Sequence, residues 1–231
     1  MKHNKFLLLV ALVCAPVITR AVTVIGSLPY VITAPGAYVV ESNLTGLNGI
    51  DVEASNVSID LGGYTLTDAK SGTNFAMTVA SGLSNVSVQN GTFSGFGWGV
   101  GFGGGGQGGG SGDKIRNVRI LNIPNGGIGL NGVNDTLIEN CFIVGVPGSN
   151  SPGITISSCS GVLLRNNQIS EYGNGIASDV YCTGCVLIGN YEANCDIGLN
   201  LDPKTKYKGN VTTNCAHPIW GNPTPVGHEN G

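Results

Sequence analysis

The hexapeptide NYEANC at Asn190–Cys195 returns as NVTTNC at Asn210–Cys215, with three of its six letters identical. Earlier segments show a related pattern, in which apolar residues alternate with other residues and the segment ends in asparagine. These segments are NVSVQN from Asn85, NVRILN from Asn117, DTLIEN from Asp135, GVLLRN from Gly161 and CVLIGN from Cys185. Such alternation over five positions indicates a β-strand. The closing asparagines recur at uneven intervals, as Asn90, Asn122, Asn140, Asn166, Asn190 and Asn210. The chain is therefore predicted to repeat one strand-containing unit and to tolerate insertions.

A second column of short segments begins with glycine: GIDV at Gly49, GVGF at Gly99, GIGL at Gly127, GITI at Gly153, GIAS at Gly175 and GLNL at Gly198. A third short strand is marked by Phe93, Ile143 and Ile169. Units built only from short strands and turns cannot bury their own apolar side, so they must stack on one another. The leucine-rich frame L-x-x-L-x-L is missing, and β-branched residues dominate. We predict an all-β parallel β-helix of about seven coils, with neighbouring coils about 4.8 Å apart.

The repeated asparagines have a structural interpretation in such a stack. An asparagine amide can hydrogen-bond the same residue on the coils above and below, as identical side chains do in cross-β ladders. NYEANC and NVTTNC are predicted to lie one coil apart. The asparagines are therefore not assigned as ligands.

The N-terminal segment 1–21 resembles an export signal. Lys2 and Lys5 precede an apolar run from Phe6 to Ala15, and the small residues Thr19 and Ala21 suit cleavage after Ala21. The run is too short to span a bilayer, and no later segment is long and apolar enough, so no transmembrane segment is predicted. We expect the protein to be secreted or periplasmic. Cleavage takes the formal charge from −3 to about −6, which argues against nucleic acid as a partner.

The mature chain divides by composition. We predict a signal peptide over 1–21, an N-terminal lead-in and cap over 22–47, a β-helix over 48–217 and a C-terminal tail over 218–231. A glycine-rich loop is expected near 101–112, and its sequence does not lead into a phosphate-binding helix.

An apolar stripe is predicted on one outer face. The strand alternation places Leu137, Leu163 and Leu187 outward, whereas Val186 and Ile188 face inward. Since an exposed sheet face is normally polar, we expect either the tail from Pro218 to Pro225, with Trp220, to fold back over the leucines, or a partner subunit or another protein to cover them.

The segment IGSLPYVITAPGAYVVESNLTG from Ile25, followed by GIDVEASNVSIDLGGYTL from Gly49, resembles the opening of exported right-handed parallel β-helix proteins of the pectate-lyase-like superfamily. The closing YKGNVTTNCAHPIWG resembles their end. The resemblance implies a right-handed helix and interaction with polysaccharide, either as a lyase or glycoside hydrolase or as a non-catalytic structural or adhesive protein of the cell envelope. The polygalacturonase patterns N-T-D, D-D, G-H-G and R-I-K do not occur, so catalysis remains an open alternative.

Two aspartates are the candidate catalytic residues. Aligning the glycine-led segments places Glu53, Gly103, Asn131, Ser157, Asp179 and Asp202 at one position, so Asp179 and Asp202 are predicted on neighbouring coils. Paired carboxylates can divide acid and base roles in glycoside cleavage or share calcium, the cofactor that this arrangement would hold. The alternative is that aspartate at a strand end makes an ordinary turn.

A basic group near these aspartates is the candidate binding site for an anionic sugar, with Lys204, Lys206 and Lys208 next to Asp202 and Arg165 two coils earlier. The lysines can equally mark a solvated last coil. Trp98, at the base of the glycine-rich tract, is a further candidate for stacking on a sugar ring or for core packing.

Six cysteines remain after cleavage of the signal: Cys141, Cys159, Cys182, Cys185, Cys195 and Cys215. An even number in an exported protein favours disulfides, and the repeat makes Cys195 and Cys215 the candidate pair. A zinc site built on CTGC lacks a second C-x-x-C, so the metal content is left unassigned.

Overall fold

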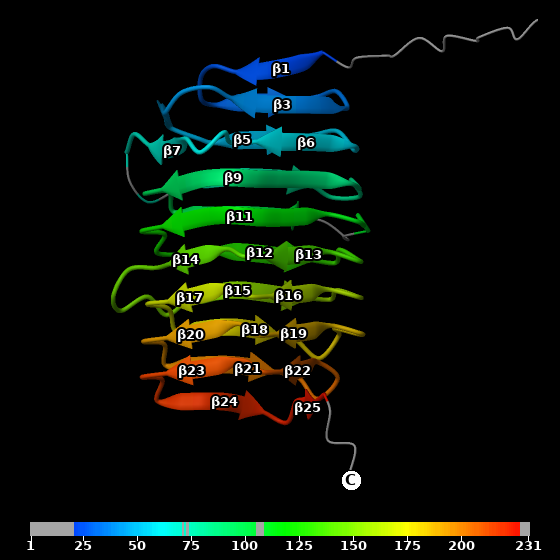
Figure 1. Cartoon of the computed structure of the whole chain (residues 1–231), viewed down its shortest axis with the longest axis vertical. Coiled ribbons are helices and arrows are strands. Elements are labelled where there is room, and N and C mark those ends of the chain that lie inside the picture. Colours follow the sequence, from blue (N-terminus) through cyan, green and yellow to red (C-terminus); the bar gives the residue numbers. More distant parts are fainter. Residues whose placement is uncertain (1–20, 71, 73, 105–108, 227–231) are drawn as a thin grey trace, which may run out of the picture.

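The chain winds into a straight stack of three-sided coils (Figure 1), in a computed structural model that describes residues 21–70, 72, 74–104 and 109–226. The expected signal peptide lies almost wholly outside the described residues. Every strand pair within these ranges is parallel, and each strand pairs with the equivalent strand of the next coil. Among the described residues there is no helix, and hence no helix that could cross a membrane.

Two sheets form the three sides of the coil. The 16-stranded sheet supplies two sides, which we call the first and second limbs, and the nine-stranded sheet supplies the third limb. The first limb contains β1 (Val22–Ile25), β3 (Gly36–Val40), β6 (Val57–Asp60), β9 (Val86–Ser94), β11 (Lys114–Leu121), β13 (Leu137–Glu139), β16 (Leu163–Arg165), β19 (Val186–Ile188), β22 (Lys206–Lys208) and β25 (Thr224–Pro225). Nine strands in the third limb give eight coil-to-coil steps, close to the predicted seven coils.

The remaining strands complete each turn of the coil. The second limb contains the later halves of β9 and β11 together with β4 (Leu44–Gly46), β7 (Thr65–Asp68), β14 (Phe142–Val144), β17 (Gln168–Ser170), β20 (Tyr191–Ala193) and β23 (Val211–Thr213). The third limb contains β2 (Tyr30–Ile32), β5 (Ile50–Val52), β8 (Phe75–Ala80), β10 (Trp98–Gly104), β12 (Ile128–Asn131), β15 (Pro152–Ser157), β18 (Asn174–Ser178), β21 (Ile197–Leu201) and β24 (His217–Gly221).

The core consists of inward side chains stacked in columns. In the third limb the buried column is Ile50, Met77, Val100, Ile128, Ile154, Ile176 and Leu199. In the second limb, the predicted third strand forms the column Phe93, Ile120, Ile143 and Ile169, which ends in buried Glu192. Apolar burial of this kind stabilises the stack by about 25 cal/mol per Å².

Residues with left-handed backbone conformation form the corners. Asn90, Asn117, Asn140 and Asn166 all have φ between 53° and 58°, and they are followed at the same corner by Gly189 and Gly209. Asparagine and glycine tolerate this region, which bulkier residues avoid. The corner turns the chain from the first limb to the second while leaving the strands extended.

The first asparagines of NYEANC and NVTTNC form a buried amide ladder. Its member on the preceding coil is Asn167 and not Asn166, the residue that the sequence alignment gave. Asn190 and Asn210 stack on Asn167, whereas Asn166 belongs to the corner column. The Asn190 Oδ1 atom accepts from the Asn167 amide at 2.9 Å, and its Nδ2 group donates to Asn210 Oδ1 at 2.9 Å and to the Leu164 carbonyl at 3.1 Å. The ladder thus ties three successive coils together.

Replacing Asn190 by Ala is expected to destabilise the protein by about 2 kcal/mol, because the buried backbone N–H and side-chain amide of Asn167 lose their shared acceptor. Urea unfolding of the variant measures the loss. Asn194→Gly is the control, since the Asn194 side chain is exposed, bonds only Glu171 and Asn214 among the described residues, and sits on a backbone with φ of 53° that glycine tolerates. Equal losses in the two variants would contradict the ladder's role.

The predicted outer stripe is wrong at its last leucine. Leu137 and Leu163 are half-buried on the outer face, but Val186 follows them, and Leu187 points inward onto Leu164. The reason is that Cys185 takes the inward position of Val162 in the preceding coil. Ile188, expected inward, is 40% exposed.

Two predicted segment boundaries also differ from the structure. The expected tail is not folded back, because 217–221 form β24 as a further rung of the third limb and Thr224–Pro225 pairs with β22. Part of the expected glycine-rich loop is strand, since β10 runs to Gly104, and its centre, 105–108, lies outside the described residues.

Candidate functional site

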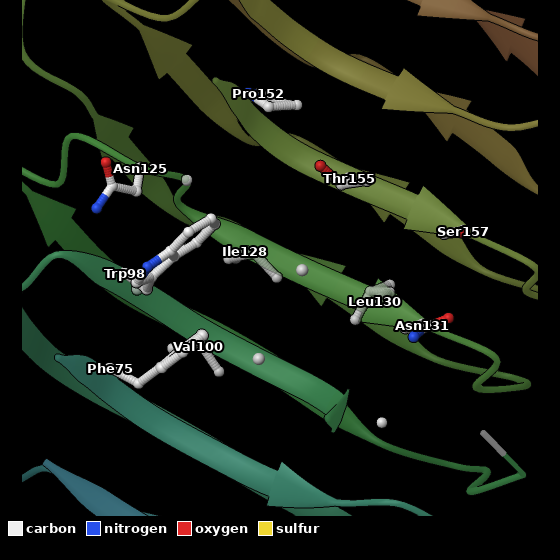
Figure 2. A pocket seen from close by; sticks show the side chains of 15 residues that line it. Phe75, Trp98, Val100, Asn125, Ile128, Leu130, Asn131, Pro152, Thr155 and Ser157 are labelled. Atoms are coloured by element: carbon white, nitrogen blue, oxygen red, sulfur yellow. The ribbon is translucent and has the colours of Figure 1, made fainter. Parts of the chain in front are cut away.

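The outer face of the third limb carries a hollow of about 410 Å³ over β8, β10, β12 and β15, which we call the trough (Figure 2). Its floor is the column of outward residues in register with one another, Gly101, Gly129 and Thr155, and Thr78 on β8 precedes them in the same column. The neighbouring positions Val100, Phe102, Ile128 and Leu130 point into the core. Two adjacent coils therefore lack an outward side chain in the middle of the sheet, which hollows the surface.

The two glycines of the trough floor, Gly101 and Gly129, have more free space around them than Gly99 and Gly127, which begin the glycine-led segments. A Cβ atom at Gly129 would meet no described atom within 4 Å, and one at Gly101 would touch only the Phe75 ring, at 3.4 Å. By contrast, a Cβ at Gly99 or Gly127 would overlap the backbone of the next coil. Gly99 and Gly127 are thus required for packing, whereas Gly129 can be enlarged without a clash.

An aromatic pair stands along one side of the trough. Phe75 and Trp98 are in register on β8 and β10, and their rings stack with centroids 5.5 Å apart and planes inclined by 16°. Each side chain is 41% exposed. Figure 2 shows both rings beside the floor, and the Trp98 ring lies 3.4 Å from where a Gly126 Cβ would be. The structure therefore places the predicted candidate Trp98 at a hollow surface and not in the core.

The polar groups of the trough are uncharged. Asn125, Asn131, Thr155 and Ser157 line it, and none of the described residues around this hollow is acidic, basic or histidine. Amide and hydroxyl groups that converge on an apolar ring are the usual lining of a specific ligand site. Exposed tryptophan offers a flat apolar face to a ligand. The chemistry available here is stacking and neutral hydrogen bonding.

A smaller hollow of about 310 Å³ adjoins the trough on β5 and β8. Asp51 and Glu53 lie on its β5 side, and Thr78, which is in register with Gly101 of the trough, donates to Asp51 Oδ1 at 2.6 Å. The N-terminal end of the third limb's outer face is therefore acidic.

Asp179 and Asp202 occupy the same position on neighbouring coils, as the alignment predicts, since β18 pairs with β21 and Ala177 lies opposite Asn200. Asp202 is 5% exposed, and its carboxylate accepts from Ser178, Thr205 and the Lys204 backbone. Both of its oxygens are thereby used in a turn. This arrangement does not suit calcium shared between the two aspartates, which would require free oxygens.

Asp179 is similarly engaged. It accepts from the Ser157 hydroxyl at 2.6 Å and from the backbone N–H groups of Ser158 and Tyr181. Burial opposes ionisation, but these hydrogen bonds outweigh it and hold the pKa of Asp179 below its ordinary value. Its contacts are those of a turn residue, one coil beyond Ser157 of the trough.

The predicted basic group does not share a face with Trp98. Arg165, Lys206 and Lys208 lie on the outer side of the first limb, in β16 and β22. Arg165 pairs with Glu139, which also binds Arg116 at 2.8 Å. The Lys204 ammonium donates to the Val180 carbonyl at 3.3 Å in the turn after β21. The structure thus separates these cations from the trough.

The disulfide expected between Cys195 and Cys215 is not formed, and all six cysteines of the described part of the chain are free thiols. Their predicted stacking is confirmed, because β20 pairs with β23 and Ala193 lies opposite Thr213. Burial, followed by the nearby Cys215 and Glu192, raises the pKa of Cys195 to about 12. The pair is a packed element of the core.

Sequence reasoning missed Phe75 and the role of the floor glycines. The available signal was the pair of segments GVGF from Gly99 and GIGL from Gly127 on neighbouring coils. The first glycine of each segment belongs to the glycine-led repeat. The second glycine, Gly101 or Gly129, stands where strand alternation predicts an outward side chain. Phe75 could not be aligned, because its coil has Ala76 where the glycine-led segments of the neighbouring coils have Gly49 and Gly99.

Residues 105–219 match the family described as right handed beta helix region. The match covers just under half of the chain, and the parallel coils of the structure agree with the β-helix that its description names.

Among solved structures, full-length tailspike protein 2 from the Escherichia coli O157:H7 bacteriophage CAB120 is similar, at 12% identity and a TM-score of 0.46. The alignment covers 83% of this chain and 32% of the tailspike chain, so the protein spans about a third of that length. No curated protein sequence matches the chain.

Proposed function

We propose that the protein is an exported polysaccharide-binding β-helix and that its trough holds a neutral glycan against Phe75 and Trp98. The observation that carries this proposal is the stacked, 41%-exposed aromatic pair beside an uncharged hollow of about 410 Å³. Sugar rings present apolar C–H faces to an aromatic ring and hydroxyls to amides. Trp98 supplies the first interaction, and Asn125, Asn131 and Thr155 supply the second.

The proposal favours binding over cleavage at this site. Glycoside hydrolysis uses two carboxyl groups about 5 to 10 Å apart on either side of the bond. In the part of the chain that the structure describes, no carboxyl group lines the trough, and the nearest predicted candidate, Asp179, holds hydrogen bonds of the adjoining turn. The site residues therefore support recognition of the sugar without a proton donor or nucleophile.

The proposal also favours a neutral ligand over a uronate. The described lining of the trough offers no cation to a carboxylate, and its N-terminal neighbour holds Asp51 and Glu53. An anionic chain lying there would be repelled, since like charges in close contact are unfavourable. Arg165, Lys206 and Lys208, expected to attract such a chain, lie on another limb.

Trp98→Ala is expected to weaken retention on immobilised neutral polysaccharides (starch, cellulose, mannan, galactan and dextran) by about tenfold or more, equivalent to ~1.4 kcal/mol. Gly129→Leu should weaken it as well, because the new side chain fills the floor at a position with no described neighbour within 4 Å. Affinity electrophoresis measures both effects.

The control for these variants is Tyr191→Ala, which removes a 40%-exposed aromatic side chain from the second limb. It should bind as the wild type does. Failure of every neutral polysaccharide to bind, or preferential binding of polygalacturonate, would overturn the proposed function.

A further inference from the structure

The floor column of the trough continues along the third limb to an exposed tryptophan. From Thr155 the register passes through Ala177 and Asn200 to Trp220 on β24. Trp220 is 54% exposed. Between Gly129 and Trp220 the column carries only a threonine, an alanine and an asparagine, so its outer side chains stay short.

A second column runs beside the first, from one aromatic pair to another. Trp98 is in register with Phe75, and β10, β12, β15, β18, β21 and β24 carry its line onward through Pro152, Asn174 and Ile197 to His217. The His217 and Trp220 rings meet edge to face, with centroids 5.2 Å apart at 72°. Both side chains are exposed. The second column therefore carries aromatic rings at both ends, and the first column adds a third ring position, Trp220, at its C-terminal end.

The surface between the two pairs is uncharged along these columns. Asn200 donates from Nδ2 to Asn174 Oδ1 at 3.3 Å, which joins the columns halfway. Asp179 flanks Ala177, but its carboxylate is directed to Ser157 and Ser158. Five coil-to-coil steps separate Gly101 from Trp220, which at about 4.8 Å per step is ~24 Å.

We propose that Trp220 and His217 form a second sugar-stacking subsite, and that the ligand is one unbranched neutral glycan lying along the axis of the coils from Trp98 to Trp220. This inference rests on the proposed function of the trough. An extended glycan of about five sugars is needed to span the ~24 Å between the two aromatic pairs. Short oligosaccharides reach only the Trp98 end, whereas longer ones contact both ends and gain affinity because the second contact is intramolecular.

The test uses oligosaccharides of about two, four, six and eight sugars, prepared from the neutral polysaccharide that the wild type retains most strongly. Titration calorimetry should show affinity that rises by about tenfold between the shortest and the six-sugar ligand and then levels off. Trp220→Ala should abolish this rise and leave binding of the shortest ligand unchanged. Trp98→Ala should weaken binding at every length.

Tyr191→Ala again serves as the matched aromatic control, and thermal unfolding checks that Trp220→Ala keeps the coils folded. A wild-type-like length dependence in Trp220→Ala would overturn the second subsite while leaving the trough intact. Equal affinity of the wild type for all lengths would do the same. Absence of binding at every length would overturn the proposed function itself.

Discussion

Replacing Glu192 by Gln will abolish most of the loss of stability that the wild type suffers between about pH 5 and pH 8. Glu192 is 0% exposed at an inward position of the second limb, and neither of its carboxyl oxygens has a hydrogen-bond partner among the described residues. Burial raises the pKa of Glu192 from 4.5 to about 8. The neutral amide of Gln resembles the protonated acid in size and charge, so the variant should fold without the pH-dependent cost.

The direction in which stability changes with pH follows from proton binding by Glu192. Between pH 4.5 and 8 the unfolded chain has released the Glu192 proton, whereas the folded protein still holds it. The stabilisation is fully present below pH 4.5 and is lost as the pH rises toward 8, at about 1.4 kcal/mol per pH unit and on the order of 5 kcal/mol in total. Asp113, whose pKa burial raises to about 6, adds a smaller loss in the same direction at lower pH.

Urea unfolding at about pH 5, 6.5 and 8 measures the effect. Exposed Glu41 provides the matched control, since Glu41→Gln makes the same chemical change outside the core. We expect Glu41→Gln to keep the wild-type slope. The same slope in Glu192→Gln would show that the buried carboxyl is ionised in the folded protein.

Gly127→Ala is expected to destabilise the protein by about 3 kcal/mol. A Cβ at this position would overlap the Gly153 carbonyl of the next coil and the Cγ2 atom of Ile143 in the core. The backbone of a stacked coil cannot move aside without disturbing its own neighbours, so overpacking here is costly. The same approach to the next coil recurs at Gly99, Gly153, Gly175 and Gly198, which explains the glycine-led repeat.

Gly129→Ala, two residues further along in β12, is the control because its Cβ would lie in open space, with no described atom within 4 Å. It should be neutral or slightly stabilising, since alanine restricts the unfolded chain. Thermal unfolding monitored by circular dichroism compares the two. Similar melting temperatures would contradict the packing role of Gly127.

The coils could be predicted from the sequence because each column repeats its own chemistry. Asn190 and Asn210, or Gly127 and Gly153, stand in equivalent places for a direct physical reason, an amide ladder or a close backbone approach. The register failed where that chemistry changed. Cys185 occupies the inward position that Val162 occupies one coil earlier. Because a cysteine stands there, the strand was aligned one residue out of register and Leu187 was assigned to the wrong face.

The candidate site was less accessible to sequence reasoning because a hollow is made by side chains that are missing. Trp98 could be identified as a stacking candidate from its type alone. Gly101 and Gly129 matter only because they fall side by side on adjacent coils. Asp202 matched a catalytic pattern, yet its hydrogen bonds to Ser178 and Thr205 are visible only in three dimensions.

The corner residues have a consequence for engineering. Asn90, Asn117, Asn140 and Asn166 turn the chain within a single residue, so the strands on either side keep their register whatever the length of the connections elsewhere in the coil. Residues 145–151 already insert a longer excursion between β14 and β15 without displacing the pairs to the next coil. Peptides grafted into that excursion should therefore be displayed from the side of the stack, at a fixed height along its axis.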